Sequence, residues 1–147
     1  MTDQQRFLAE VEHLAFYGLK RDGQGFAHDV LKGVRQHRPD LQITPVHPAA
    51  DDIGGMAVVG TAKAILPRPD SAMIVLSKYK ASEALEDAAG AEIRRIWLVM
   101  NACSRENVAY ARGLGLQVLG GCPLLFVPDA GFPHNAHRWL AKLFCKL

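Results

Sequence analysis

The chain has 147 residues, a formal net charge of +2 and 49% hydrophobic residues, which favours one domain over residues 1–147 and excludes a disordered or collagen-like chain. The near balance of acidic and basic residues gives no electrostatic footprint for a nucleic acid. No apolar run approaches the roughly 20 residues that a membrane-spanning helix needs, and the polar N-terminus lacks a signal-peptide core, so we expect a cytoplasmic protein with neither nucleic acid nor membrane as a partner.

The first half of the chain predicts a helix, a strand and a loop in close succession. A short helix over residues 4–11 precedes an apolar strand over 14–17, which stops at Gly18. A glycine-bearing loop then opens a helix whose apolar positions recur at helical spacing from Phe26 onward. This helix ends at Pro39, because a proline pushes the residue before it out of the α region.

A proline marks the second predicted strand as a peripheral one. Residues 41–46 form an apolar segment, and Pro45 lacks the N–H that an inner strand donates to its neighbour. We therefore place this strand near an edge of the sheet or place the proline at the strand end. An irregular stretch over residues 51–69 follows, with a short apolar piece at 56–59.

The second half of the chain alternates buried strands with helices. Its strands are apolar throughout, which is typical of strands that are covered on both faces. We expect strands over residues 72–76, 96–100 and 117–119, helices over 82–89 and 105–114, a further apolar strand over 124–127, and a closing helix over about 135–145 that docks on the body. Ser104 is expected to cap the second of these helices, because its hydroxyl can accept a free backbone N–H.

This alternation predicts an α/β fold. Helices on both faces and right-handed crossovers give a Rossmann-like, doubly wound, mainly parallel sheet of five strands in a three-layer αβα arrangement. We expect the strand order 3-2-1-4-5, with the strand at residues 14–17 in the centre and the core of the domain over about residues 10–127. In such sheets, ligands bind beyond the carboxyl ends of the strands, at the point where the strand order reverses.

The loop after the first strand is the most informative segment for function. Gly18 lets the backbone turn at the strand end, and Gly23 and Gly25 let main-chain N–H groups approach a ligand without interference from a Cβ atom. The following helix directs the positive end of its dipole to the same place, which favours phosphate. The glycine spacing is neither Gly-x-Gly-x-x-Gly nor that of a P-loop, so a glycine-rich turn without a ligand is the alternative interpretation.

The end of the second strand distinguishes between nucleotide ligands. An NAD-binding fold usually has Asp or Glu there, which accepts hydrogen bonds from the adenosine ribose. This chain has His47 and Pro48 instead, and its next acid, Asp51, comes only later. The missing acid disfavours NAD. Lys20 and Arg21 could face the additional phosphate charge of another ligand. The alternative interpretation is that both are solvated cations of the loop.

The cysteines and histidines predict no convincing catalytic or metal site. Cys103, Cys122 and Cys145 form no Cys-x-x-Cys pair, which fits a reducing compartment and argues against both a disulfide framework and a zinc ribbon. Cys103 and Cys122 come near strand ends, but the sequence places no base beside either, so we expect both to be small packing residues. His134 and His137 lack a third metal ligand with convincing spacing.

Four features of the chain, taken in order, resemble those of a known family. They are the helix leading into a strand and a long glycine-bearing loop; residues 43–48, similar to a strand ending in Val-Asn-Pro; residues 60–67, similar to a Ser-Leu-x-x-Ile-Pro turn; and the tryptophan-bearing strand at 96–98, followed by Gly115-Leu116 and Gly121-Cys122-Pro123. With these features the chain resembles, over about residues 10–127, the small stand-alone CoA-binding proteins. The fold of that family is like the nucleotide domain of the succinyl-CoA synthetase alpha subunit.

The resemblance implies a ligand and a site. In that family the adenosine and the phosphates of the ligand lie over the first loop and the ends of the second and third strands. The matching cofactor-binding positions here are Gly18, Leu19, Lys20, Gly25, Phe26, His47, Pro48, Ser77 and Lys78. The resemblance therefore implies that the chain holds coenzyme A or an acyl-CoA, a small nucleotide ligand, at the carboxyl ends of the parallel strands.

Three interpretations of function stay open at this point. The preferred one is a non-catalytic CoA-binding protein. The second is a small NAD(P)-binding or CoA-using enzyme with Cys103 or Cys122 as the reactive group, and the third is a degenerate domain that acts only through protein contacts. The missing acid after the second strand disfavours the NAD(P) version, and the missing catalytic pairing disfavours the CoA-using enzyme. A homo-oligomer is compatible with all three.

Overall fold

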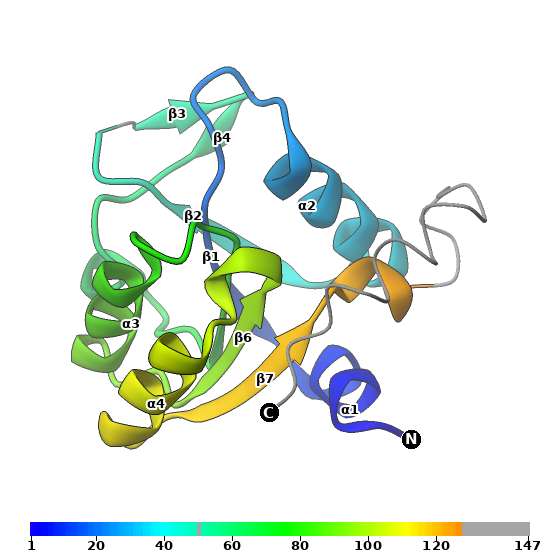
Figure 1. Ribbon diagram of the computed structural model, residues 1–147. Helices are drawn as coiled ribbons and strands as arrows, with labels where there is room; N and C mark the ends of the chain where they lie inside the picture. The colour runs from blue at the N-terminus through cyan, green and yellow to red at the C-terminus, as the bar shows by residue number, and fades with distance from the viewer. Residues whose placement is uncertain (50, 128–147) are drawn as a thin grey trace.

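The computed structural model describes residues 1–49 and 51–127, and it places a parallel sheet between two layers of helices (Figure 1). The strands of this sheet are β1 (His13–Tyr17), β2 (Gln42–Val46), β5 (Ser71–Ile74), β6 (Arg95–Val99) and β7 (Gln117–Gly121). The helices are α1 (Asp3–Glu10), α2 (Phe26–His37), α3 (Ala81–Gly90) and α4 (Arg105–Gly113). The predicted three-layer α/β fold is confirmed. The helix predicted over about 135–145 lies outside the described residues.

The strand order differs from the predicted one. All neighbouring strands of the sheet are parallel, but in chain order they lie 2-1-3-4-5 (β2-β1-β5-β6-β7) rather than 3-2-1-4-5. The central strand is therefore β5 and not β1. Burial explains the observed order, because every residue of β5 is buried between two neighbours, whereas β2 has an exposed first residue and contains Pro45, which suits an edge.

The described residues between β2 and β5 form a small hairpin and a single helical turn instead of a crossover α-helix. The antiparallel strands β3 (Asp52–Ile53) and β4 (Met56–Ala57) precede the 3-10 helix η1 (Ala62–Ala64). Val59 attaches this segment to the outer side of β2: its carbonyl accepts from the N–H of His47 at 2.9 Å, and its N–H donates to the carbonyl of Pro45 at 3.2 Å. The segment thus covers part of a sheet edge that could otherwise pair with another chain.

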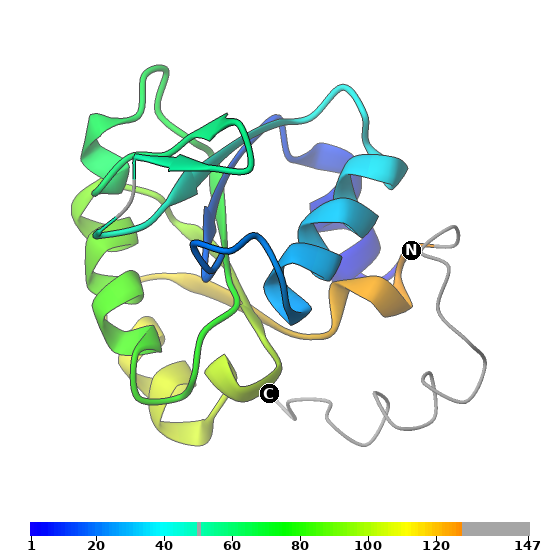
Figure 2. The same cartoon turned by 90° about the horizontal axis from the view of Figure 1, so that it is seen from above.

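Each face of the sheet carries its own hydrophobic core. Helices α1 and α2 lie on one face and α3 and α4 on the other (Figure 2). Phe16 and Trp97 belong to the core under α1 and α2, whereas Ala15 and Ile96 belong to the core under α3 and α4. This division follows from the strands themselves, because successive side chains of a strand point to opposite faces. Among the described residues, no helix is long and apolar enough to span a membrane.

The apolar segment after β7 is not the strand that we predicted. It begins with the 3-10 helix η3 (Pro123–Leu125), and Leu124 and Val127 are buried in the core under α1 and α2. Apolar content predicted the burial of this segment but not its backbone conformation. Pro123 has a fixed φ and no N–H, which suits the first position of a helical turn.

Candidate functional site

A cavity of about 930 Å³ opens at the carboxyl ends of the strands. Its lining includes His47 after β2, Gly18 after β1, Val75 after β5 and Met100 after β6. The chain leaves β1 toward α2 on one face of the sheet and leaves β5 toward α3 on the other. The cavity therefore lies at the point where the strand order reverses, which is the expected position for a ligand in a sheet of this kind.

The cavity brings most of the predicted site residues together. The predicted residues that line it are Gly18, Leu19, Lys20, Phe26, His47, Pro48 and Ser77. The other two are not part of its lining: Gly25 is the N-cap residue of α2, and Lys78 is exposed, with its Nζ 5.0 Å from the centre of the Tyr79 ring. Contact between any of these residues and a ligand stays a prediction.

The ends of β1 and β5 approach each other so closely that only a glycine fits at Gly18. Its φ is +117°, and a Cβ atom on it would lie only 1.9 Å from the carbonyl oxygen of Val75. The N–H of Val75 in turn donates to the carbonyl of Tyr17 at 2.9 Å, which holds the end of β1 against the residue that follows β5. Only glycine leaves room for the chain to turn there, so the loop begins directly over the neighbouring strand end.

The loop after Gly18 directs positive charge to the beginning of α2. The N-cap residue of α2 is Gly25, with φ +99°, and no side-chain hydrogen bond caps the helix within the described part of the chain. The first N–H groups of a helix have no partner inside the helix. The Nζ of Lys20 lies 3.8 Å from the position that a Cβ on Gly25 would occupy. An ammonium group and the positive end of a helix thus converge, which is an arrangement that favours an anion.

Leu19 and Phe26 anchor this loop from inside the protein. Leu19 is 3% exposed and belongs to the core under α1 and α2. The half-buried Phe26 packs against the same core. Within the loop, the N–H of Gly23 donates to the carbonyl of Lys20 at 3.0 Å. Because apolar residues fix both ends of the loop, its backbone is held in place beside the cavity.

His47 offers a hydrogen-bond donor at the end of β2. The ring is half-buried, and its Nδ1 accepts from the backbone N–H of Ala49 at 3.0 Å. In the neutral ring the proton therefore resides on Nε2, because one nitrogen accepts and the other donates. At the position where an NAD site has a carboxylate acceptor, this chain therefore has the Nε2–H donor of His47.

Asp87 is a residue of the site that sequence reasoning missed. It lines the cavity from α3, and its carboxylate accepts from the hydroxyl of Tyr17 at 2.7 Å, from the hydroxyl of Thr61 at 2.5 Å and from the N–H of Ala62 at 2.9 Å. Burial, together with the adjacent Asp87 carboxylate, raises the pKa of Tyr17, so this hydroxyl stays protonated. Asp87 therefore ties β1, α3 and the segment before η1 together at one wall of the cavity.

The two cysteines in the described part of the chain, Cys103 and Cys122, do not line the cavity. Cys122 is 2% exposed, and burial raises the pKa of its thiol, which confirms the prediction of a packing residue. Cys103 takes part in a disulfide, contrary to what the cysteine spacing led us to expect. Among the described residues, no group of three potential ligands is placed to hold a metal ion; His134 and His137 lie outside that part of the chain.

The chain is similar to a known family and to several solved structures. Residues 12–128 match the model of a family described as "CoA binding domain". Among solved structures, a hypothetical protein from Pyrococcus horikoshii is similar with a TM-score of 0.73 and 19% identity, over 96% of this chain and 93% of that one. A protein from Thermus thermophilus has a TM-score of 0.72 and 18% identity, over 88% and 99%. The dinucleotide-forming acetyl-coenzyme A synthetase 1 of Ca. Korarchaeum cryptofilum has a TM-score of 0.67 and 20% identity, over 80% of this chain and 27% of that one. No curated protein matches the chain significantly.

Proposed function

The chain belongs to the CoA-binding domain family, and from this premise we propose that it holds coenzyme A or an acyl-CoA in the cavity at the carboxyl ends of the strands. The observation that carries the proposal is the convergence of Lys20 with the uncapped N-terminus of α2. CoA carries a pyrophosphate and a 3′-phosphate, which need N–H donors and positive charge. The first turn of α2 supplies the donors, and Lys20 and Arg21 supply the charge.

The proposed phosphate position gives the remaining predicted residues their roles. Gly18 and Gly25 keep Cβ atoms away from the backbone that faces the phosphates. The Nε2–H of His47 suits a phosphate oxygen or a ribose hydroxyl as acceptor. The cavity, at about 930 Å³, lies within the range of roughly 300–1,000 Å³ that is usual for small-molecule sites.

We further propose that the protein binds its ligand without chemistry of its own. A cysteine enzyme would need a thiolate that reaches the ligand, with a base beside it. Cys122 is buried, and burial raises the pKa of its thiol, which disfavours the thiolate. The Cys103 sulfur is in a disulfide. These observations favour a binding protein over the enzyme that uses one of these two cysteines.

Calorimetric titration of the full chain with CoA, and separately with NAD, tests the proposal. We expect CoA to bind more tightly, because the end of β2 offers the imidazole of His47 where NAD requires a carboxylate. Equal affinities would contradict the site as described. Undetectable binding of both ligands would instead support a degenerate domain that acts through protein contacts.

A further inference from the structure

The cavity extends over both faces of the sheet, and its charges are divided between them. Leu19 in its wall belongs to the core under α1 and α2, whereas Tyr17 and Ala84 belong to the core under α3 and α4. The charged side chains of the described lining, histidine aside, are Lys20 and Arg21 in the loop before α2, and Lys80, Glu83 and Asp87 on α3 or at its N-cap. Both carboxylates of the described lining therefore lie on the α3 side.

This division of charge separates the parts of a nucleotide ligand. The wall on the α2 side has two cations and no carboxylate among its described residues, so it attracts phosphates. The wall on the α3 side repels them, because Glu83 and Asp87 together outweigh the charge of Lys80. It suits an uncharged part of the ligand that carries a hydrogen-bond donor, since a carboxylate only accepts hydrogen bonds. The adenine base of CoA has such a donor in its 6-amino group.

The base can reach the α3 side from the end of β2. His47 at that end suits the ribose, which connects the base to the phosphates. The adjacent lining consists of Val46 from β2, Gly60 from the segment that is hydrogen-bonded to β2, and Ala84 from α3. Val46 and Ala84 belong to the same core, and an aromatic ring gains from burial against apolar side chains.

Glu83 is the carboxylate of this wall that has capacity left for a ligand. Asp87 already accepts three hydrogen bonds from donors of the protein. Glu83 precedes Asp87 by one turn on the same side of α3, because residues four apart in a helix are neighbours. Within the described chain, the exposed side chain of Glu83 takes part in no hydrogen bond or ion pair. Its oxygens are therefore available to a donor in the cavity.

We propose that Glu83 selects adenine as the base of the ligand by accepting a hydrogen bond from the 6-amino group. The base then lies on the α3 side of the cavity, and the phosphates lie on the α2 side. This inference rests on the proposed function, because it requires the phosphates to lie at Lys20 and the beginning of α2.

Calorimetric titration of the full chain with two ligands tests this role. The ligands are CoA and an analogue with unsubstituted purine in place of adenine, which lacks the 6-amino group. The wild-type protein should bind CoA about ten-fold more tightly than the analogue, as expected for one hydrogen bond to a charged group. In Glu83→Ala this affinity ratio should fall close to one. Because both ligands carry the same phosphates, the ratio does not respond to the lost repulsion between Glu83 and the phosphates.

Two further variants serve as controls. Glu86→Ala changes the same type of residue on α3, but Glu86 is not one of the residues that line the cavity, and it accepts instead from the hydroxyl of Tyr110. Its affinity ratio should remain that of the wild type. Glu83→Gln keeps an oxygen acceptor without the charge, so it should retain part of the preference for adenine. Thermal unfolding is recorded for each variant.

The outcomes separate this inference from the proposed function. Equal affinities of the wild-type protein for the two ligands, or a wild-type ratio in Glu83→Ala, overturn the role of Glu83 and leave CoA binding intact. The same fall of the ratio in Glu86→Ala also overturns it. Failure of the wild-type protein to bind CoA overturns both. If Glu83→Ala does not unfold cooperatively, Glu83→Gln takes its place, and an undiminished ratio there has the same meaning.

Discussion

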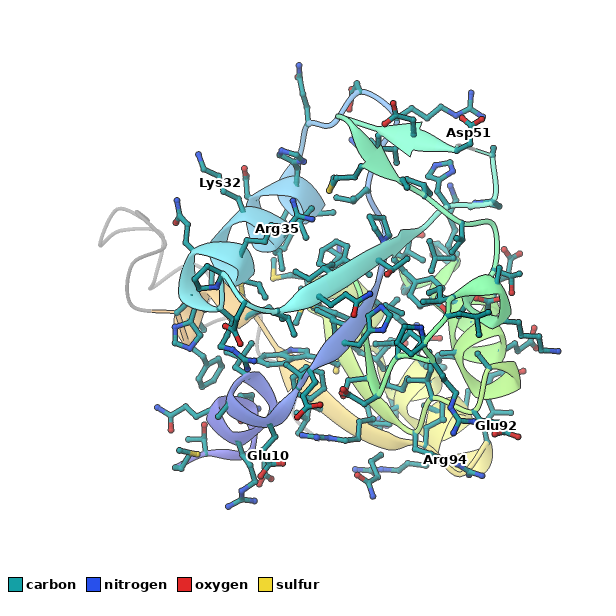
Figure 3. The ribbon with its side chains drawn as sticks, turned by 180° about the vertical axis from the view of Figure 1, so that it is seen from behind. Glu10, Lys32, Arg35, Asp51, Glu92 and Arg94 are labelled. Carbon is teal, nitrogen blue, oxygen red and sulfur yellow. The ribbon has the colours of Figure 1, made fainter. Side chains whose placement is uncertain are left out.

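The two ends of the sheet place their polar groups in opposite ways. At the amino end, a carboxylate oxygen of Asp70 accepts from the backbone N–H groups of Glu12 and His13, both at 2.9 Å, and Nε2 of His13 lies 2.8 Å from the hydroxyl of Thr44. At the carboxyl end, the first turn of α2 has no side-chain cap within the described chain, and Lys20 is exposed beside it. Figure 3 shows Asp51 at the latter end of the molecule and Glu10 and Arg94 at the former.

This difference teaches how one sheet combines stability with a binding site. Polar groups that pair with each other stabilise the fold but have little capacity left for a ligand. Groups held in place by apolar anchors, such as the loop that Leu19 secures, keep their hydrogen-bonding capacity. Substitutions at the carboxyl end should therefore change binding, except where the backbone is crowded or where polar groups pair with each other as Asp87 and Tyr17 do. Substitutions at the amino end should change stability.

Gly18→Ala should cause the largest loss of stability. It is the exception among substitutions at the carboxyl end, because the backbone at Gly18 is crowded. A Cβ atom 1.9 Å from the carbonyl oxygen of Val75 forces the two strand ends apart, which we expect to lower the free energy of unfolding by about 3 kcal/mol or to prevent folding. Urea unfolding measures the loss. Gly113→Ala is the control, because nothing lies within 4 Å of its added Cβ, and its stability should change by less than about 1 kcal/mol. Equal stability of the two variants would contradict the close approach.

Gly25→Val should weaken CoA binding strongly while the fold persists. The branched side chain would crowd both Lys20 and the N–H groups at the beginning of α2, with a loss of CoA affinity of at least about ten-fold. Gly55→Val is the matched control, because Gly55 also has a positive φ, of +84°, but lies in the turn of the β3–β4 hairpin with nothing within 4 Å of its added Cβ. Calorimetry that shows equal CoA affinity in both variants would place the phosphates elsewhere.

Lys20→Met should weaken CoA binding less. An exposed charge is worth up to about 1 kcal/mol, or roughly five-fold in affinity, and salt screens it. The loss should therefore shrink when CoA titrations are repeated at high ionic strength. Lys32→Met is the control, since Lys32 lies on α2 (Figure 3) and is not one of the residues that line the cavity. A loss of affinity that does not depend on salt would show that Lys20 acts by shape and not by charge.

His13 provides the smallest expected effect, and it acts on stability alone. Burial lowers the pKa of His13 below its usual value of 6.5, against the weaker opposing effect of Asp70. Because the folded state disfavours the protonated ring, its contribution to stability is fully present above pH 6.5 and is lost as the pH falls through the lowered pKa. Urea midpoints measured from about pH 7.5 to about pH 5 should fall less steeply in His13→Gln than in the wild type.

An exposed histidine serves as the control for this pH effect. His37 lies at the end of α2 with its side chain in solvent. The variant His37→Gln should retain the pH dependence of the wild type. A pH dependence in His13→Gln identical to that of the wild type would mean that the buried ring does not contribute to it.

Local chemistry made much of the fold predictable. The hydroxyl of Ser104 accepts from the N–H of Asn107 at 3.1 Å, as predicted for a helix cap. The strand order was not obtained, because it depends on which strands become neighbours. Two sequence features nevertheless indicated the observed strand order. Pro45 requires an edge position, and residues 72–76 are apolar throughout, which suits the centre of the sheet. The order 3-2-1-4-5 would have placed Pro45 in an inner strand.

The candidate site was predictable where residues follow a strand end. Gly18, His47 and Ser77 were found in this way, and all three line the cavity. Asp87 was missed because its role depends on contacts with Tyr17 and Thr61, which are far away in sequence. The available signal was Tyr17, a hydroxyl in an otherwise apolar strand, because a buried hydroxyl requires a hydrogen-bond partner.

A crystal structure of the full chain with CoA tests the central claim most directly. The account predicts that the pyrophosphate lies within hydrogen-bond distance of the N–H groups at the beginning of α2, close to Nζ of Lys20. It also predicts that Nε2 of His47 lies within hydrogen-bond distance of a phosphate oxygen or a ribose hydroxyl of the ligand. Phosphates at the beginning of α3, or a CoA molecule outside the cavity, would contradict it.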